Sequence, residues 1–132
     1  MRLTLTLTAT ALLLATPALA GPKEEAEVTR LAQCTTHLAA LSVLAETFPT
    51  DARIKPLADR MNPLLPRVGA RFDALRKVVG DEKTQAITEK VFADAKPQIE
   101  AVVGAKDPAA ALVTNHGKAL DACLTEIAKL PA

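Results

Sequence analysis

Aromatic side chains are scarce in this sequence. The chain has no tryptophan and no tyrosine, and its three phenylalanines are Phe48, Phe72 and Phe92. Proteins that stack nucleic-acid bases or enclose flat cofactors usually rely on aromatic rings. The composition therefore argues against base stacking and against an aromatic-lined cofactor pocket.

An excess of charge of either sign is also missing. The chain carries 16 lysines and arginines against 15 aspartates and glutamates. The first twenty residues hold one arginine and no acidic residue, so the remainder is balanced. Because nucleic-acid-binding domains usually show a strong basic excess, we expect no nucleic-acid partner.

Residues that commonly carry catalysis are few. The chain has two histidines and two cysteines. It contains no recognisable Ser/His/Asp arrangement, glycine-rich phosphate loop, His-Glu-x-x-His motif or pair of catalytic carboxylates. We therefore expect that the protein is not an enzyme and that it needs no cofactor.

The first twenty residues have the pattern of a secretory signal peptide. Arg2 precedes an apolar run over residues 3–14, and Ala18 and Ala20 are the small residues that a signal peptidase recognises. The run is shorter than the roughly 20 apolar residues of a membrane-spanning helix. We expect cleavage before Gly21, and a single periplasmic or secreted domain over residues 21–132 without a transmembrane segment.

Apolar residues recur in steps of three and four through four segments, which is the period of an amphipathic helix. In residues 24–48 the predicted core stripe is Leu31, Cys34, Leu38, Leu41, Ala45 and Phe48. In residues 107–131 it is Val113, His116, Leu120, Cys123, Ile127 and Leu130. In residues 50–80 it is Ile54, Leu57, Met61, Leu65, Val68, Phe72, Leu75 and Val79. In residues 81–104 it is Ile87, Val91, Ala95, Ile99 and Val102. Short connections between four such helices predict an all-α, antiparallel four-helix bundle.

Proline and glycine mark the expected boundaries of these helices. The second segment is interrupted by three prolines, which remove backbone hydrogen bonds: Pro56, Pro63 and Pro66. We expect a short helical piece, a break with Asn62 as N-cap and Pro63 at the first helical position, and then a firm helix to Gly80. A kink is expected at Pro97. Asp107 is the expected cap of the last helix.

The two cysteines are best explained as one disulfide. Cys34 and Cys123 lie on the core stripes of the first and last helices, at similar depths from the two ends of the exported chain. The exported chain enters an oxidising environment, where such a pair forms a bond. Closing a loop of about 90 residues stabilises the fold by about 4–5 kcal/mol in the chain-entropy treatment, and by about 2–4 kcal/mol in typical cases.

A metal or haem site is the alternative use of these residues. Cys34 and His37 share a helix face, but His116 and Cys123 are separated by about 10 Å along one helix, so one ion cannot bind both. A three-ligand site from Cys34, His37 and Cys123 stays open only while the thiols are reduced. His116 and His37 are also candidate ligands. An axial haem ligand at His116 resembles the soluble b-type cytochrome bundles in architecture only, since the first helix lacks methionine and no Cys-x-x-Cys-His motif is present. The ordinary interpretation is a hydrogen-bonded His116 at the edge of the core and a partly exposed His37.

Arginines are concentrated in the second segment. Five of the six arginines after residue 20 lie there: Arg53, Arg60, Arg67, Arg71 and Arg76. The spacing would align Arg53, Arg60, Arg67 and Arg71 on a continuous helix. Such a row either pairs with the acidic first helix or binds a phosphate or carboxylate through its guanidinium groups.

The functional expectation from the sequence is a non-catalytic periplasmic or secreted helical protein. Its expected ligand is a partner protein or an anionic component of the cell envelope, bound through Arg53, Arg60, Arg67 and Arg71. The alternative is a small haem- or metal-binding bundle that uses His116, His37 or both.

Overall fold

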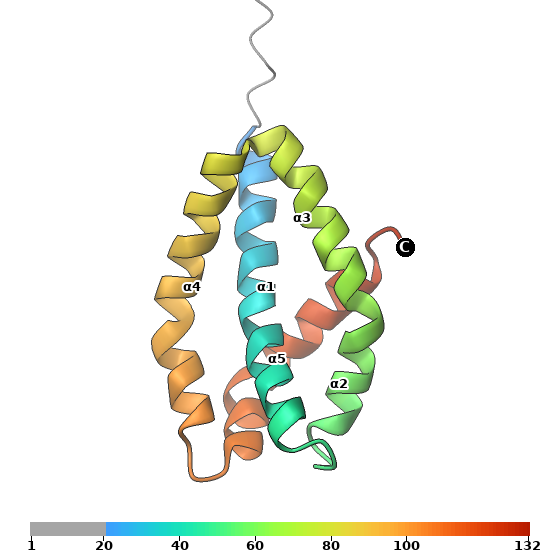
Figure 1. Ribbon diagram of the computed structural model, residues 1–132, viewed down its shortest axis with the longest axis vertical. Helices are drawn as coiled ribbons and strands as arrows, with labels where there is room; N and C mark the ends of the chain where they lie inside the picture. Colours follow the sequence, from blue (N-terminus) through green and yellow to red (C-terminus); the bar gives the residue numbers. More distant parts are fainter. Residues whose placement is uncertain (1–20) are drawn as a thin grey trace, which may run out of the picture.

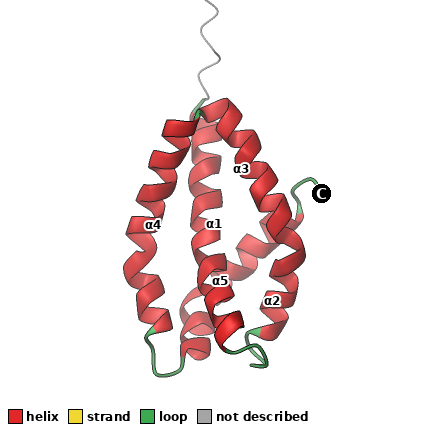
Figure 2. Ribbon diagram, viewed as in Figure 1, coloured by secondary structure: helices red, strands yellow, loops and turns green. Residues whose placement is uncertain are grey.

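The described part of the chain, residues 21–132 of a computed structural model, is built from helices and loops and contains no strand (Figures 1 and 2). The predicted signal peptide, residues 1–20, lies outside the described residues. The helices are α1 (Pro22–Thr47), α2 (Lys55–Met61), the 3₁₀ turn η1 (Asn62–Leu64), α3 (Leu65–Val79), α4 (Asp81–Val103) and α5 (Pro108–Ala128). The turn η1 joins α2 and α3 directly, so the four predicted helical segments and the all-α class are confirmed.

The ends of most helices follow from the expected residues. Gly80 joins α3 to α4 at φ 97°, a backbone conformation that glycine adopts without strain. The Asp107 side chain caps α5 by accepting a hydrogen bond from the Ala110 amide at 3.1 Å. Gly104 follows the last residue of α4. These three boundaries confirm the predictions made from sequence.

The proline-rich segment breaks where expected, but by a different mechanism. The α-helix changes to a 3₁₀ turn over Asn62–Leu64. Asn62 itself has helical angles, φ −53° and ψ −46°, and its side chain caps nothing, so the predicted N-cap is wrong. Pro63 is accommodated inside a tighter turn rather than at the start of a new helix. Pro97 lies inside α4 and does not end it.

Helix α1 is the centre of the fold. Its buried residues lie on several sides of the helix and include Val28, Ala32, Thr36, Leu38, Ala40, Leu41 and Leu44. The segment formed by α2 and α3 lies on one side of α1 and α4 on the other, while α5 crosses behind α1 at an angle (Figure 1). An ion pair between Lys83 and Glu25, near the starts of α4 and α1, is consistent with the parallel course of these helices.

The regular antiparallel bundle is not confirmed. In an up-down-up-down bundle the first and third long helices are diagonal to each other. Here the corresponding helices, α1 and α4, pack together along parallel courses, and α5 is oblique (Figure 1). The apolar surface of α1 extends over more than one stripe, which allows it to contact all the other helices.

The predicted core stripes are only partly correct. Leu31, Leu38 and Leu41 are buried as expected, as are the apolar residues of α5 around Cys123. Three predicted core residues are instead exposed: Phe48 (38%), Leu65 (42%) and Val113 (42%). The stripe of α4 is mostly half-buried, because only Thr84 and Val102 of that helix are fully buried. Helix α4 therefore lies nearer the surface than α1 or α5.

The predicted disulfide is confirmed by the positions of its cysteines. Cys34 on α1 and Cys123 on α5 have Cα atoms 5.3 Å apart, within the range that a disulfide requires, and both side chains are buried. The bond ties the first helix to the last. Among residues 21–132, none of the helices combines the length and hydrophobicity required to cross a membrane.

Candidate functional site

The arginines of the second segment do not form an unoccupied patch. Arg53 binds Asp51 at 2.8 Å and Asp107 at 3.0 Å, and it lowers the pKa of Asp51 to about 2. Arg60 binds Asp121 of α5 at 2.8 Å. Both arginines therefore link their own segment to the loop before α5 or to α5 itself.

The other two candidate arginines also have partners within the protein. Arg67 donates hydrogen bonds to the carbonyls of Ala128 and Leu130, at 3.0 and 3.3 Å. Arg71 makes a two-point contact with Glu27 of α1, with N–O distances of 2.5 and 2.7 Å, and this contact lowers the pKa of Glu27. An external anion would have to compete with these partners.

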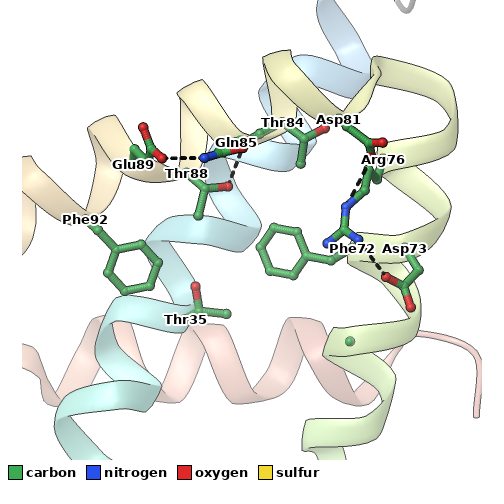
Figure 3. A pocket seen from close by; sticks show the side chains of 11 residues that line it. Thr35, Phe72, Asp73, Arg76, Asp81, Thr84, Gln85, Thr88, Glu89 and Phe92 are labelled. Carbon is green, nitrogen blue, oxygen red and sulfur yellow. Dashed lines mark hydrogen bonds and ion pairs between the residues drawn. The ribbon is translucent and has the colours of Figure 1, made fainter.

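A groove lies between α3 and α4. Its volume is about 800 Å³, and residues of α1, α3 and α4 line it. Phe72 of α3 and Phe92 of α4 face each other across Thr35 of α1 (Figure 3). Gly80 holds the ends of α3 and α4 together, and the two helices diverge from that turn (Figure 1). We call this hollow the α3–α4 groove.

The missing side chain of Gly69 adds to the space in the groove. Gly69 lies on α3 and lines the hollow. A Cβ atom added there would meet nothing within 4 Å. A methyl group therefore fits at this position, and a larger side chain would begin in open space at the edge of the groove.

The groove contains one buried hydroxyl group without a hydrogen-bond partner. Thr84 is 4% exposed, and its Oγ1 is the only buried side-chain oxygen or nitrogen without a partner in residues 21–132. The neighbouring hydroxyls are used, since those of Thr88 and Thr35 donate to the carbonyls of Thr84 and Ala32. An unpaired buried polar group typically costs about 1–3 kcal/mol. Because this oxygen is shielded from solvent, a bound group would reach it only if the neighbouring side chains moved.

The rim of the groove is acidic. The groove is lined by three acidic residues, Asp73, Asp81 and Glu89, and by one basic residue, Arg76. Arg76 lies between Asp73 and Asp81, at 3.5 and 3.6 Å (Figure 3). Glu89 accepts a hydrogen bond from Gln85 and forms no ion pair with another described residue. The rim therefore favours a positively charged occupant.

The two histidines of the chain lie side by side. The ring of His37 on α1 and the ring of His116 on α5 have their centres 5.3 Å apart, with an angle of 50° between the ring planes. Both are half-buried, beside a cavity of about 10 Å³ that Gln98 of α4 also lines. Burial, and secondarily the charge of His116, lowers the pKa of His37 below its ordinary value of 6.5.

The sequence predicts His37 and His116 as candidate ligands, singly or together, but their apolar stripes do not place the two rings side by side. One signal for their proximity was available: His37 follows Cys34 and His116 precedes Cys123, so in antiparallel helices both lie on the same side of the disulfide. The disulfide removes both cysteines as thiolate ligands. The described residues contain no group of three or more His, Cys, Asp or Glu side chains arranged for a metal ion.

The space beside the histidines limits what they can bind there. A cavity of about 10 Å³ accommodates a water molecule or a single ion, whereas a porphyrin would require the helices to separate. Comparison of the chain with protein-family models, with curated proteins and with solved structures finds no match.

Proposed function

We propose that the protein is a non-catalytic binding protein that acts outside the cytoplasm and holds a basic, amphipathic helix of a partner protein in the α3–α4 groove. The observation that carries this proposal is the groove itself, with two of the three phenylalanines of the chain and the unpartnered Thr84 hydroxyl. The disulfide between the first and last helices is compatible with an oxidising compartment.

The walls of the groove supply the apolar part of the contact. Phe92 is 37% exposed, and Phe72 is only partly buried. Burying a wholly exposed phenylalanine is worth about 1.5–3 kcal/mol, so covering the 37% of Phe92 that is exposed is worth about 0.5–1 kcal/mol. In a chain with so few aromatic residues, two phenylalanines on facing walls favour an apolar ligand surface.

The length of the groove suits a short helix. The α4 wall runs from Asp81 to Phe92, which corresponds to about 16 Å at 1.5 Å per residue, or about three helical turns. Amphipathic helices commonly bind by laying apolar residues into such a groove, with anchors at positions i, i+3, i+4 and i+7. A helix here would lie over α1, the central helix of the fold.

Charge distinguishes the proposed ligand from other apolar ligands. The excess of carboxylates at Asp73, Asp81 and Glu89 over Arg76 favours lysine or arginine residues on the polar face of the ligand helix. An anionic ligand at Arg53, Arg60, Arg67 and Arg71, which is the first expectation from sequence, is less favoured because each of these side chains has an internal partner.

Peptide binding tests this proposal. The probe is an amphipathic Leu/Lys peptide that carries one tryptophan. It has about twelve residues, which matches the length of the groove wall. Because the protein has no tryptophan or tyrosine, the peptide fluorescence is free of protein background. We expect the peptide to bind, and we expect a Leu/Glu peptide of the same pattern to bind much more weakly.

Substitutions at Gly69 locate the binding site. Gly69→Phe should fill the groove and weaken peptide binding by about tenfold or more, the effect of losing about 1.4 kcal/mol. Gly69→Ala is the matched control, because it makes the same change in the backbone without filling the groove, and it should bind as the wild type does. Equal binding to Gly69→Phe and wild type would refute the groove as the site. Equal binding of the Leu/Lys and Leu/Glu peptides would refute the role of the acidic rim.

A further inference from the structure

We propose that His37 and His116 form a binding site for an exchangeable divalent transition-metal ion, of the class of Zn²⁺, Ni²⁺ and Cu²⁺, between α1 and α5. The site is separate from the α3–α4 groove, and the inference does not depend on the function proposed for the groove. It rests on the spacing of the two rings, on their lack of other partners and on the size of the space beside them.

The spacing of the rings matches a shared ion. The ring centres are 5.3 Å apart. Two imidazoles bound to one tetrahedral ion, with metal–nitrogen bonds of about 2.0–2.1 Å, have their ring centres about 5 Å apart. The separation of the two rings is therefore compatible with a shared ion.

Neither ring has another hydrogen-bond partner within the described residues. The side-chain hydrogen bonds of residues 21–132 include none from or to His37 or His116. Neither histidine has a ring nitrogen among the fully buried polar atoms without a partner, so these nitrogens are accessible to solvent. The expectation of a His116 that is hydrogen-bonded at the core edge is therefore not met, and both rings have nitrogen atoms available for an ion.

The surroundings set the remaining coordination positions. The cavity beside the rings is lined by apolar side chains apart from Thr36 and Gln98, and it holds no charged side chain. The Thr36 hydroxyl already donates to the Gln33 carbonyl, which leaves the amide oxygen of Gln98 as the other side-chain oxygen in the lining. The volume of about 10 Å³ accommodates one ion or one water. Water that completes the coordination of the ion would therefore bind from the solvent side, where Gln98 is exposed.

The donor set selects the class of ion. Imidazole nitrogen suits zinc, copper and nickel, whereas calcium and magnesium require oxygen ligands. Two imidazoles and one amide leave positions open to water. Such a site releases its ion more readily than a closed structural site with four protein ligands. It is thus suited to an ion that exchanges, and a bound ion would connect α1 with α5 beside the disulfide.

Nuclear magnetic resonance of the wild-type protein tests the proposal without any substitution. The chain has only two histidines, so chelator-treated protein should give two imidazole Hε1 signals. Addition of ZnCl₂ should shift or broaden both signals together and saturate at one ion per protein. A shift of only one histidine, or of neither at millimolar zinc, would overturn the shared site.

Substitution identifies the ligands. In calorimetric titrations with ZnCl₂ and NiCl₂, His37→Gln and His116→Gln should each weaken binding by about tenfold or more, and the double variant should lose no more than either single variant. Circular dichroism of the metal-free variants establishes that they are folded. Undiminished binding to the folded double variant would place the ion elsewhere and refute the proposal.

Discussion

The contact between Arg71 and Glu27 is expected to be the arginine interaction that matters most for stability. It joins α3 to the central helix α1 through two hydrogen bonds, and the two side chains are only 36% and 24% exposed. Hydrogen bonds to charged groups contribute about 1.5–3 kcal/mol when well shielded, and exposure reduces that value. We expect Arg71→Met to lower the free energy of unfolding by about 1–2 kcal/mol.

This loss should be visible in thermal denaturation followed by circular dichroism. For a domain of this size, each kcal/mol lowers the melting temperature by about 4 °C, so Arg71→Met should melt about 4–8 °C below the wild type. Arg60→Met is the matched control. It removes one contact, with Asp121, between side chains that are 46% and 66% exposed, and it should change the melting temperature by about 2 °C or less.

Lowering the pH should remove the stability that Arg71 provides relative to methionine at the same position. Arg71 holds the pKa of Glu27 below its ordinary value of 4.5. A carboxylate with a depressed pKa in the folded state contributes its stability above the unfolded pKa, and this contribution is lost as the pH falls through the folded pKa. The difference in melting temperature between wild type and Arg71→Met should therefore be full at pH 6 and should shrink below about pH 4.

Two results would refute this reasoning. One is an equal loss for Arg71→Met and Arg60→Met. The other is full additivity of Glu27→Gln and Arg71→Met, since two members of one contact should not lose its free energy twice. Unchanged stability of Arg71→Met together with weaker binding to vesicles that contain anionic lipid would support the anion-binding interpretation of the arginines.

The remaining predictions concern the disulfide, two glycines and the buried hydroxyl, and all are measured by denaturant unfolding. Cys34→Ser and Cys123→Ser should each cost about 2–4 kcal/mol, and additive losses in the double variant would contradict a bond between them. Gly69→Ala should stabilise α3 by about 0.5–1 kcal/mol, whereas Gly80→Ala should destabilise the protein because of its positive φ; similar effects at both sites would contradict this account. Thr84→Val should raise stability by about 1 kcal/mol, and a loss would indicate that the hydroxyl has a partner.

The helices and the disulfide could be predicted because both depend on local information. The apolar spacing and the boundary residues Gly80 and Asp107 each determine structure within one or two turns of the chain. The two cysteines lie at similar distances from the two ends of the chain over residues 21–132, which places them at one level of the fold. The prediction of Asn62 as an N-cap was wrong because Pro63 can also be accommodated inside a 3₁₀ turn. The sequence does not distinguish such a turn from the start of a new helix.

The candidate sites could be predicted only in part. A stripe indicates which side of a helix is apolar, but the number of neighbours decides how deeply it is buried, so Val113 remains exposed. The arginines were recognised as a cluster, but their pairing with Glu27 and Asp121 depends on how α3 packs against α1 and how α2 packs against α5. The groove arises from the divergence of α3 and α4, and nothing local in either helix specifies it.

The disulfide also has a consequence for resistance to proteolysis. It joins α1 to α5, so every loop between those helices lies inside one covalently closed ring. A protease that cuts once, for example between α1 and α2, opens the ring but leaves both fragments in the same molecule. Release of a fragment requires a reductant or a second cut. In a compartment that contains proteases and no reductant, a nicked copy of this protein would keep its helices together and could retain its binding surface.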